Sequence, residues 1–322
     1  MATRPGGCLF QLGYYFYSKT RVGYYMHRRD LAKARRKFED GHSKTEPTKF
    51  NGLQILPIAI LEDNYSYLVM DTINKTAVCV DPADAQAVQA AIEAHSVTPV
   101  AILTTHKHWD HSGGNSDLKH VYPEMRVYGG AMDNIPAVTH PVADGDVLQF
   151  GAMKFEVNFT PGHTVGHVIF RLDGSPFGAP DSLFSGDHLF LCGCGRMFEG
   201  APGVMLRSLD HLTELKDDTL VWPGHEYAMD NLEFAIDLEQ NNQAAQQKLA
   251  WVREQRKDRA CTSPSTIEEE KQYNPFLRTN TDTILQSLGL ELSKDGETSK
   301  DAVRAQALAE IRQRKDHFKY KL

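Results

Sequence analysis

The chain has 322 residues, of which 41% are hydrophobic and 24% are charged, so it can bury a sizeable core in one large or two ordinary domains. Residues 1–50 hold 11 Lys and Arg against 4 Asp and Glu, a net charge of +7, whereas the whole chain carries −7 and the remainder therefore −14. The acidic remainder argues against nucleic acid as a partner and leaves an anionic surface as a partner for the basic segment alone. Five cysteines without zinc-finger spacing argue against a disulfide framework and favour a reducing compartment.

Residues 1–50 are predicted to form a basic, aromatic N-terminal arm. Residues 6–18 form an uncharged stretch of 13 residues, which is shorter than the about 18–20 residues that span a bilayer. Residues 27–40 (HRRDLAKARRKFED) indicate a basic helix. Aromatic rings followed by Lys and Arg are typical of a segment in a membrane interface, so we expect an anionic membrane surface to bind residues 8–37. A mitochondrial presequence and a plain solvated tail are the alternatives, and without membrane or mitochondrial association the expected location is cytoplasmic.

From residue 51 onward, short β-rich runs alternate with helical segments after a polar linker around Pro47, which predicts an α/β layered architecture. Asp84 is expected to be the N-cap of an Ala-rich helix that runs to residue 95. Strands are expected at 53–60, 65–70, 76–81, 99–106, 126–128, 154–159, 167–172, 182–185 and 219–222, and helices at 204–215 and 231–238.

Residues 240–322 are predicted to form a helical domain packed on a body of residues 51–239. Residues 240–258 have a strongly helical composition, and residues 301–318 indicate a last long helix. Between them, Ser265 with Glu268 three residues later predicts a capping box at a helix N-terminus.

The stretch TTHKHWDHSGG, residues 104–114, follows a predicted buried strand and concentrates metal-ligating side chains. Four donors within six residues suit a transition metal that prefers nitrogen and oxygen ligands, and four from one loop would crowd a single ion. Three later segments, each at a strand end, carry further donors, and such ends converge on one edge of a layered sheet. A polar turn with chance histidines is the alternative. The donors are His106, His108, Asp110 and His111, followed by His163 and His167, by Asp187 and His188, and by His225.

This motif set resembles the metallo-β-lactamase superfamily, whose T-H-x-H-x-D-H motif matches residues 105–111. The resemblance implies a four-layer αββα sandwich with two divalent metal ions per chain, zinc being expected and iron the alternative. It implies that His106, His108 and His163 hold one ion, that Asp110, His111 and His225 hold the other, and that Asp187 bridges them. His167 and His188 are expected to orient ligands, and Cys192 and Cys194 to serve packing and turns. Asp110 is also the expected catalytic residue, orienting or deprotonating a water whose pKa the metals lower toward about 7.

Further stretches over about residues 51–322 are similar to glyoxalase II, the hydroxyacylglutathione hydrolases: LFLCGCGRMFEG, PGHEYAMDNLEFA, STIEEEKQYNPFLR and IRQRKDHF. The resemblance implies hydrolysis of glutathione thioesters, such as S-acylglutathione or lactoylglutathione-like compounds, by a metal-bridged hydroxide. Two features depart from the family: Arg196-Met197-Phe198 stands where it usually has Lys-Phe-Tyr, and His188 stands where it has a small Thr. We expect both departures to lie in the substrate pocket. The implied substrate-binding residues are Arg196, Phe198, Tyr227, Arg312 and Lys315.

Two other functions remain open from the sequence. One is a persulfide dioxygenase-like enzyme with a single iron, against which the complete second ligand set and the helical domain count. The other is a membrane-tethered regulatory or scaffold protein with a drifted pocket, which Phe198, His188 and the arm motivate. The arm resembles that of one vertebrate branch of the family, which has membrane-associated, mitochondrial and cytosolic forms.

Overall fold

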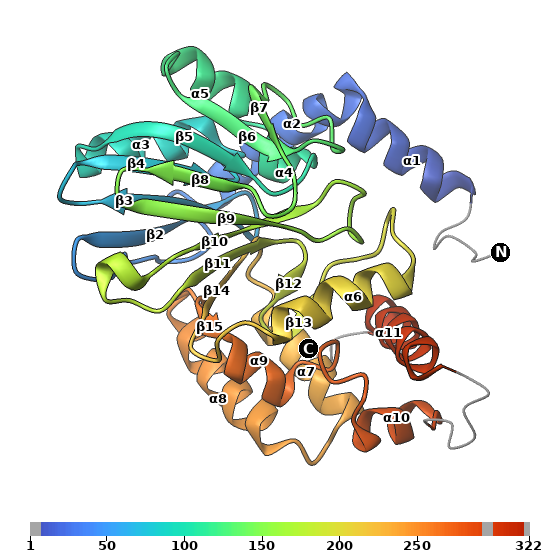
Figure 1. The fold of residues 1–322 in the computed structure, drawn as a ribbon. Coiled ribbons are helices and arrows are strands. Elements are labelled where there is room, and N and C mark those ends of the chain that lie inside the picture. The colour runs from blue at the N-terminus through green and yellow to red at the C-terminus, as the bar shows by residue number, and fades with distance from the viewer. Residues whose placement is uncertain (1–7, 292–298, 319–322) are drawn as a thin grey trace.

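The computed structural model describes residues 8–291 and 299–318. Two β-sheets lie face to face, and helices cover their outer faces (Figure 1). The first sheet has seven strands in sequence order: β1 (Thr48–Lys49), β2 (Leu53–Ile60), β3 (Asn64–Asp71), β4 (Thr76–Val80), β5 (Thr98–Thr104), β6 (Arg126–Gly130) and β7 (His140–Val142). The second has six in the order β15 (Ser265–Thr266), β14 (Leu220–Pro223), β11 (Ser182–Gly186), β10 (Val168–Leu172), β9 (Met153–Phe159) and β8 (Val147–Phe150).

The main core lies between the two sheets, because both present apolar side chains to each other. Ile55 and Leu103 of the first sheet and Phe155, Phe170 and Trp222 of the second belong to this one buried cluster. On the outer side of the first sheet, α3 (Ala85–His95) and α5 (Asn115–Val121) cover a second cluster. Asp84 is the N-cap of α3, as predicted, since its carboxylate accepts hydrogen bonds from the backbone of Gln86 and Ala87.

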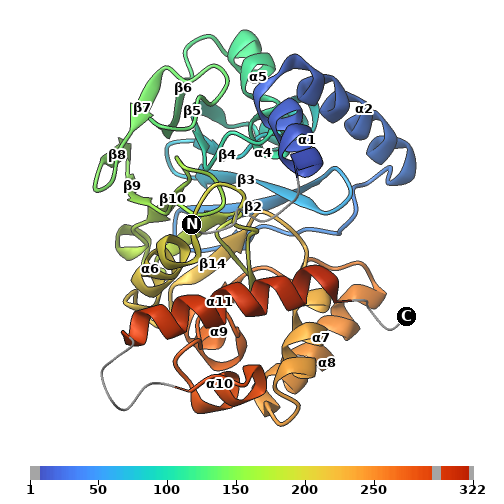
Figure 2. The same cartoon turned by 90° about the vertical axis from the view of Figure 1, so that its right-hand side faces the viewer.

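Helices also cover the second sheet and form the C-terminal region (Figures 1 and 2). A third cluster joins the outer face of this sheet to α6 and α11. The predicted α/β sandwich with a helical C-terminal region is therefore confirmed, while the domain boundary at 239/240 stays a prediction. The helices are α6 (Pro202–Thr213), α7 (Ala228–Leu238), α8 (Gln243–Lys257), α9 (Ile267–Tyr273), α10 (Asp282–Leu288) and α11 (Lys300–His317).

The N-terminal arm forms two helices, α1 (Cys8–Lys19) and α2 (Arg21–Lys37), that dock on the body. His27 Nε2 lies 3.0 Å from the carbonyl oxygen of Ala83, and Arg35 pairs with Asp84. Gly23 allows this docking, because a Cβ there would lie 2.7 Å from Trp109 Nε1 and 1.8 Å from the carbonyl oxygen of Tyr17. Within the part of the chain that the structure describes, no helix is long and apolar enough to cross a bilayer.

Some local predictions are wrong. The capping box lies one residue later than expected, with Thr266 as N-cap and Glu269 at its third helical position. Ser265 does not cap the helix, because its hydroxyl donates to Glu270 and the backbone N–H of Glu268 donates to the carbonyl oxygen of Asp217. The expected linker is partly ordered by pairing, since Lys44 forms a β-bridge with Ala260 and residues 48–49 form β1. The sequence also missed β7, β8 and the short hairpin of β12 (Leu189–Phe190) with β13 (Gly193–Cys194).

Candidate metal centre

A first group of donors converges where β5, the β9–β10 loop and β11 meet. His106 Nε2 and His163 Nε2 each lie 3.0 Å from His108 Nδ1, and His163 Nε2 lies 3.3 Å from Asp187 Oδ2. The ligand atoms of these four buried residues all lie within 4.8 Å of one another. Three imidazole nitrogens and one carboxylate oxygen thus face a common point.

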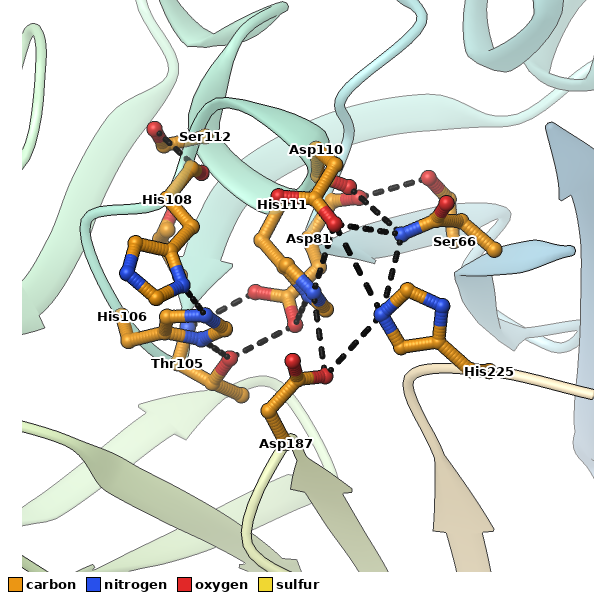
Figure 3. A network of polar contacts seen from close by, with 12 residues as sticks. Ser66, Asp81, Thr105, His106, His108, Asp110, His111, Ser112, Asp187 and His225 are labelled. Atoms are coloured by element: carbon orange, nitrogen blue, oxygen red, sulfur yellow. Dashed lines mark hydrogen bonds and ion pairs between the residues drawn. The ribbon is translucent and has the colours of Figure 1, made fainter. Parts of the chain in front are cut away.

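A second group lies beside the first, as Figure 3 shows. Asp110 and His111 stand on α4 (Trp109–Ser112), and His225 follows β14. Their ligand atoms also lie within 4.8 Å of one another. Asp187 Oδ1 lies 3.1 Å from His111 Nε2 and 3.2 Å from His225 Nε2, so the Asp187 carboxylate stands between the two groups.

Each of the five histidines has its second ring nitrogen engaged by a further partner. Such partners fix the tautomer and the ring orientation of a metal-ligating histidine. The pairs are His106 Nδ1 with Thr105 Oγ1 (3.1 Å), His108 Nε2 with Tyr14 Oη (3.0 Å), His111 Nδ1 with Asp81 Oδ2 (3.0 Å), His163 Nδ1 with the Arg196 carbonyl oxygen (2.8 Å) and His225 Nδ1 with Asp63 Oδ1 (2.8 Å).

The donor set fits divalent cations. His111 Nε2 and Asp187 Oδ1 are buried and have no hydrogen bond to any residue that the structure describes. Burial, together with neighbouring histidines, holds the pKa of His106 and of His108 well below the ordinary value, so both imidazoles are neutral ligands at pH 7. Burial also opposes the charge of His225, but Asp187 and Asp63 outweigh it and raise its pKa to about 10. Neutral imidazoles at His106 and His108, together with buried donor atoms of His111 and Asp187 that lack hydrogen bonds, form a nitrogen and oxygen ligand set of the kind that zinc-like ions prefer.

A cavity of about 470 Å³ opens over both donor groups, and residues of both α1 and α11 belong to its lining. Arg312 Nη1 donates to the carbonyl oxygen of Cys194, Lys315 Nζ donates to that of Asp230, and Tyr227 stacks on His225 with ring centroids 4.6 Å apart. All five predicted substrate residues belong to the lining, which includes Tyr14, Tyr17, His108, Asp110, His163, Asp187, Arg196, Phe198, His225, Tyr227, Arg312 and Lys315.

The remaining predicted residues lie behind the cavity or in its wall. His167 stacks on His106 with ring centroids 5.1 Å apart, and its Nδ1 lies 2.9 Å from Thr160 Oγ1. His188 is fully buried and is not part of the cavity lining, so its expected place in the pocket is wrong; burial lowers its pKa to about 3. Burial raises the pKa of the Cys194 thiol to about 12 and that of Cys192 well above its ordinary value, which leaves both thiols un-ionised and poorly nucleophilic.

Sequence reasoning missed the residues that surround the donors. Asp81 is the last residue of the strand predicted at 76–81, a position at which it could have been recognised alongside the other strand-end donors. Asp63, Tyr14 and Tyr17 carried no such signal, since they lie far from their partners in the sequence. A buried ion cluster was also missed: Lys107 Nζ lies 2.7 Å from Glu199 Oε2 and 3.3 Å from Asp133 Oδ1.

Comparisons with known proteins agree with this geometry. The model of the metallo-beta-lactamase superfamily matches residues 61–225, and that of the hydroxyacylglutathione hydrolase C-terminus matches residues 226–318. A cytoplasmic hydroxyacylglutathione hydrolase of Arabidopsis thaliana is 40% identical over 269 residues, covering 83% of this chain and 100% of the relative. A hydroxyacylglutathione hydrolase of a Synechococcus strain is 42% identical over 264 residues, covering 80% of this chain and 97% of the relative.

Solved structures show the same fold. ETHE1 from Myxococcus xanthus has a TM-score of 0.52 at 22% identity and covers 83% of this chain and 99% of its own. A metallo-beta-lactamase from Staphylococcus aureus has a TM-score of 0.53 at 22% identity, covering 78% of this chain and 67% of its own. Together with the sequence relatives, these matches show that the chain belongs to the metallo-β-lactamase superfamily and, within it, to the hydroxyacylglutathione hydrolase (glyoxalase II) family.

Proposed function

We propose that this chain is a metal-dependent hydrolase that cleaves glutathione thioesters. The observation that carries the proposal is a cavity whose lining joins both donor groups to Arg196, Arg312 and Lys315. Three cations beside two clustered metal sites suit a substrate that carries carboxylates at one end and a reactive carbonyl at the other. Relatives that are 40–42% identical over most of the chain are named hydroxyacylglutathione hydrolases, which supports this substrate class.

In this proposal, His106, His108 and His163 would hold one divalent ion and Asp110, His111 and His225 the other, with Asp187 as a donor available to both. Zinc is the expected metal and iron the alternative. Such ions make hydroxide available at neutral pH and polarise the carbonyl that is attacked.

Asp110 is proposed to orient the attacking water. Its Oδ1 accepts a 3.0 Å hydrogen bond from Tyr17 Oη, and its Oδ2 accepts a 3.1 Å hydrogen bond from Asn64 Nδ2. These two donors fix the plane of the carboxylate, and Oδ2 lies 3.6 Å from His225 Nε2 and 3.7 Å from His111 Nε2. A carboxylate held in this way presents one oxygen to the cluster without rearranging.

The other residues of the cavity are proposed to bind the glutathione part. Arg312 and Lys315 lie one turn apart on α11, and burial lowers the pKa of Lys315 to about 8. In the structure these two cations donate to backbone carbonyl oxygens. Carboxylates of the substrate can take the place of those oxygens and form charge-assisted hydrogen bonds. Tyr227 and Phe198 contribute ring surface, and Arg196 adds a third cation that is already paired with Asp316.

Metal analysis of the purified chain, with hydrolysis assays over a panel of glutathione thioesters before and after chelation, tests the function. We expect two metal ions per chain and a turnover that chelation abolishes and metal restores. Two bound ions without turnover of any thioester would contradict the hydrolase and favour a scaffold with a drifted pocket. Oxygen consumption with glutathione persulfide would favour the iron dioxygenase instead.

We also propose that residues 8–37 bind an anionic membrane surface. The outer side of α1 and α2 exposes apolar residues, among them Leu12, Tyr15 and Tyr25, and Arg29 and Lys33 are largely exposed on α2. Rings and cations exposed together favour a headgroup layer that carries negative charge. Cosedimentation with vesicles should require phosphatidylserine and weaken with salt, and equal binding to neutral vesicles would contradict the proposal. Mitochondrial targeting by the same arm is the alternative, which an import assay distinguishes.

A further inference from the structure

The arm contributes side chains to the metal centre itself. Four of the five ligand histidines are oriented by the body of the protein, but the partner of His108 is Tyr14 of α1. Helix α1 lies outside both matched family models, which cover residues 61–225 and 226–318. We propose that Tyr14 and Tyr17 are positioning residues of the metal centre, an inference that rests on the two metal sites of the proposed function.

Tyr14 connects His108 to the partly buried carboxylate of Glu199. Its hydroxyl donates to Glu199 Oε1 at 3.1 Å and lies 3.0 Å from His108 Nε2. Since its own proton goes to Glu199, Tyr14 accepts from His108, and the Nε2–H tautomer leaves Nδ1 as the lone pair that faces the cluster. Glu199 is in turn held by Lys107 Nζ at 2.7 Å and by the backbone N–H of Val165 at 2.8 Å. In the usual arrangement a carboxylate contacts the metal-ligating histidine directly. Here the Tyr14 hydroxyl lies between His108 and the Glu199 carboxylate.

Tyr17 performs the matching task for the second group. Its hydroxyl donates to Asp110 Oδ1, the oxygen turned away from the closest histidine contacts, while Oδ2 faces His111 and His225. Tyr14 and Tyr17 are three residues apart, so a single face of α1 presents both hydroxyls to the two donor groups.

The helix is fastened beside the ligand loop, so these hydroxyls are held in place before any ligand binds. The indole Nε1 of Trp109, which lies between His108 and Asp110 in the sequence, donates to the carbonyl oxygen of Tyr17 at 2.9 Å. The ring of Tyr14 stacks on Phe198 with centroids 4.9 Å apart and planes 25° from parallel. Preorganised outer partners of this kind strengthen metal binding because the ligands lose less freedom when the ion arrives.

Tyr14→Phe and Tyr17→Phe, made separately in the full chain, test the inference because each removes one hydroxyl and keeps the ring. Tyr15→Phe is the matched control, since Tyr15 lies between them on α1 and is 53% exposed. Zinc affinity is measured by competition with a chromophoric chelator, and the absorption spectrum of the cobalt-loaded chain reports on ligand geometry. We expect about 10–100-fold weaker zinc binding and an altered cobalt spectrum for Tyr14→Phe and Tyr17→Phe, and no change for the control.

Thermal unfolding of the metal-free variants shows whether each remains folded, so a loss of affinity in a folded chain supports the inference. Wild-type zinc affinity and cobalt spectrum in both variants would overturn it. Unchanged affinity with faster thioester hydrolysis would also overturn it, because the tyrosines would then obstruct the site. Zinc competition needs no substrate, so a chain that binds zinc tightly but cleaves no thioester contradicts the proposed function and leaves the role of Tyr14 and Tyr17 intact.

Discussion

Asp81 Oδ2 lies 3.0 Å from His111 Nδ1, and the same carboxylate accepts hydrogen bonds from the backbone N–H and the hydroxyl of Thr105. Asp81 has a φ of 46°, a left-handed conformation that is uncommon outside glycine and less costly for Asp than for most residues. Asp81, the first residue after β4, thus orients His111 directly and His106 through Thr105. Both donor groups depend on this single carboxylate.

Asp81→Ala is therefore expected to weaken metal binding at both sites by about 10–100-fold. Because His111 loses its orienting partner, the affinity for metal should fall most at the site that contains Asp110 and His225. Zinc titration against a chelator measures the effect, with Glu124→Ala as a control that removes an exposed acid far from the donors. Two zinc ions bound with wild-type affinity would contradict the role of Asp81.

Asp187→Ala should remove bound metal and hydrolysis together, because the carboxylate contacts His163 with one oxygen and His111 and His225 with the other. His106→Ala should affect mainly the first ion. Elemental analysis and thioester hydrolysis on the same preparations compare the two losses. Full hydrolysis by a metal-free variant would refute the proposed chemistry.

Lys315→Ala should raise KM for glutathione thioesters with little change in kcat, because Lys315 lies in the cavity lining, where its Nζ donates to the carbonyl oxygen of Asp230. Loss of one charge-assisted hydrogen bond corresponds to about 1.5–3 kcal/mol, or about 10–150-fold in kcat/KM. Arg314→Ala is the control, since Arg314 lies outside the cavity lining and pairs with Glu310 and the carbonyl oxygen of Ser287. A fall in kcat at unchanged KM would place Lys315 in the chemical step.

Glu270 predicts a pH dependence of stability. It is fully buried and accepts hydrogen bonds from Ser265, Tyr273, Asn274 and the backbone of Cys192, yet burial outweighs them and raises its pKa from 4.5 to about 7. Between these two values the unfolded chain has lost the proton that the folded chain retains, so the free energy of unfolding falls as pH rises, by about 3 kcal/mol in total.

Glu270→Gln should remove this part of the pH dependence, because an amide can donate to the hydroxyls of Ser265 and Tyr273 and still accept from Asn274. Urea unfolding of metal-free protein at pH 5 and pH 7.5 compares the wild type with this variant. Glu268→Gln, which changes an exposed carboxylate on the same helix, should keep the wild-type slope. The assignment to Glu270 fails if its variant shows that slope too.

The sequence allowed the donor residues to be predicted because they carry two local signals. They follow apolar strands, and four of them form one compact motif. Their outer partners could not be predicted, since Tyr14 lies 94 residues before His108 and Asp63 lies 162 residues before His225. Only the packing of α1 and of the segment before β3 brings these groups together.

The arm shows the same limit. Its aromatic and basic composition predicts a membrane interface, and composition cannot say which rings turn inward. Contacts with Trp109 and Phe198 place Tyr14 and Tyr17 in the cavity, whereas Tyr15 and Tyr25 stay exposed.

The capping box shows a second limit. Ser265 and Thr266 both precede glutamates at the right spacing, so the sequence allows either residue to be the N-cap. The later register forms because the Ser265 hydroxyl donates to Glu270 and the Glu268 N–H donates to Asp217, and these long-range partners cannot be predicted from the local sequence.

The C-terminal end of the arm, residues 42–44, is hydrogen-bonded to the body of the protein. His42 Nε2 lies 2.8 Å from the carbonyl oxygen of Asn64, and Lys44 exchanges backbone hydrogen bonds with Arg259 and Cys261. If α1 leaves the cavity, it stays covalently attached to the body, so its return is a unimolecular step whose rate does not depend on protein concentration. Cleavage of the backbone between residues 38 and 42 would make that return a bimolecular step. Dilution alone would then remove the hydroxyls of Tyr14 and Tyr17 from the metal centre.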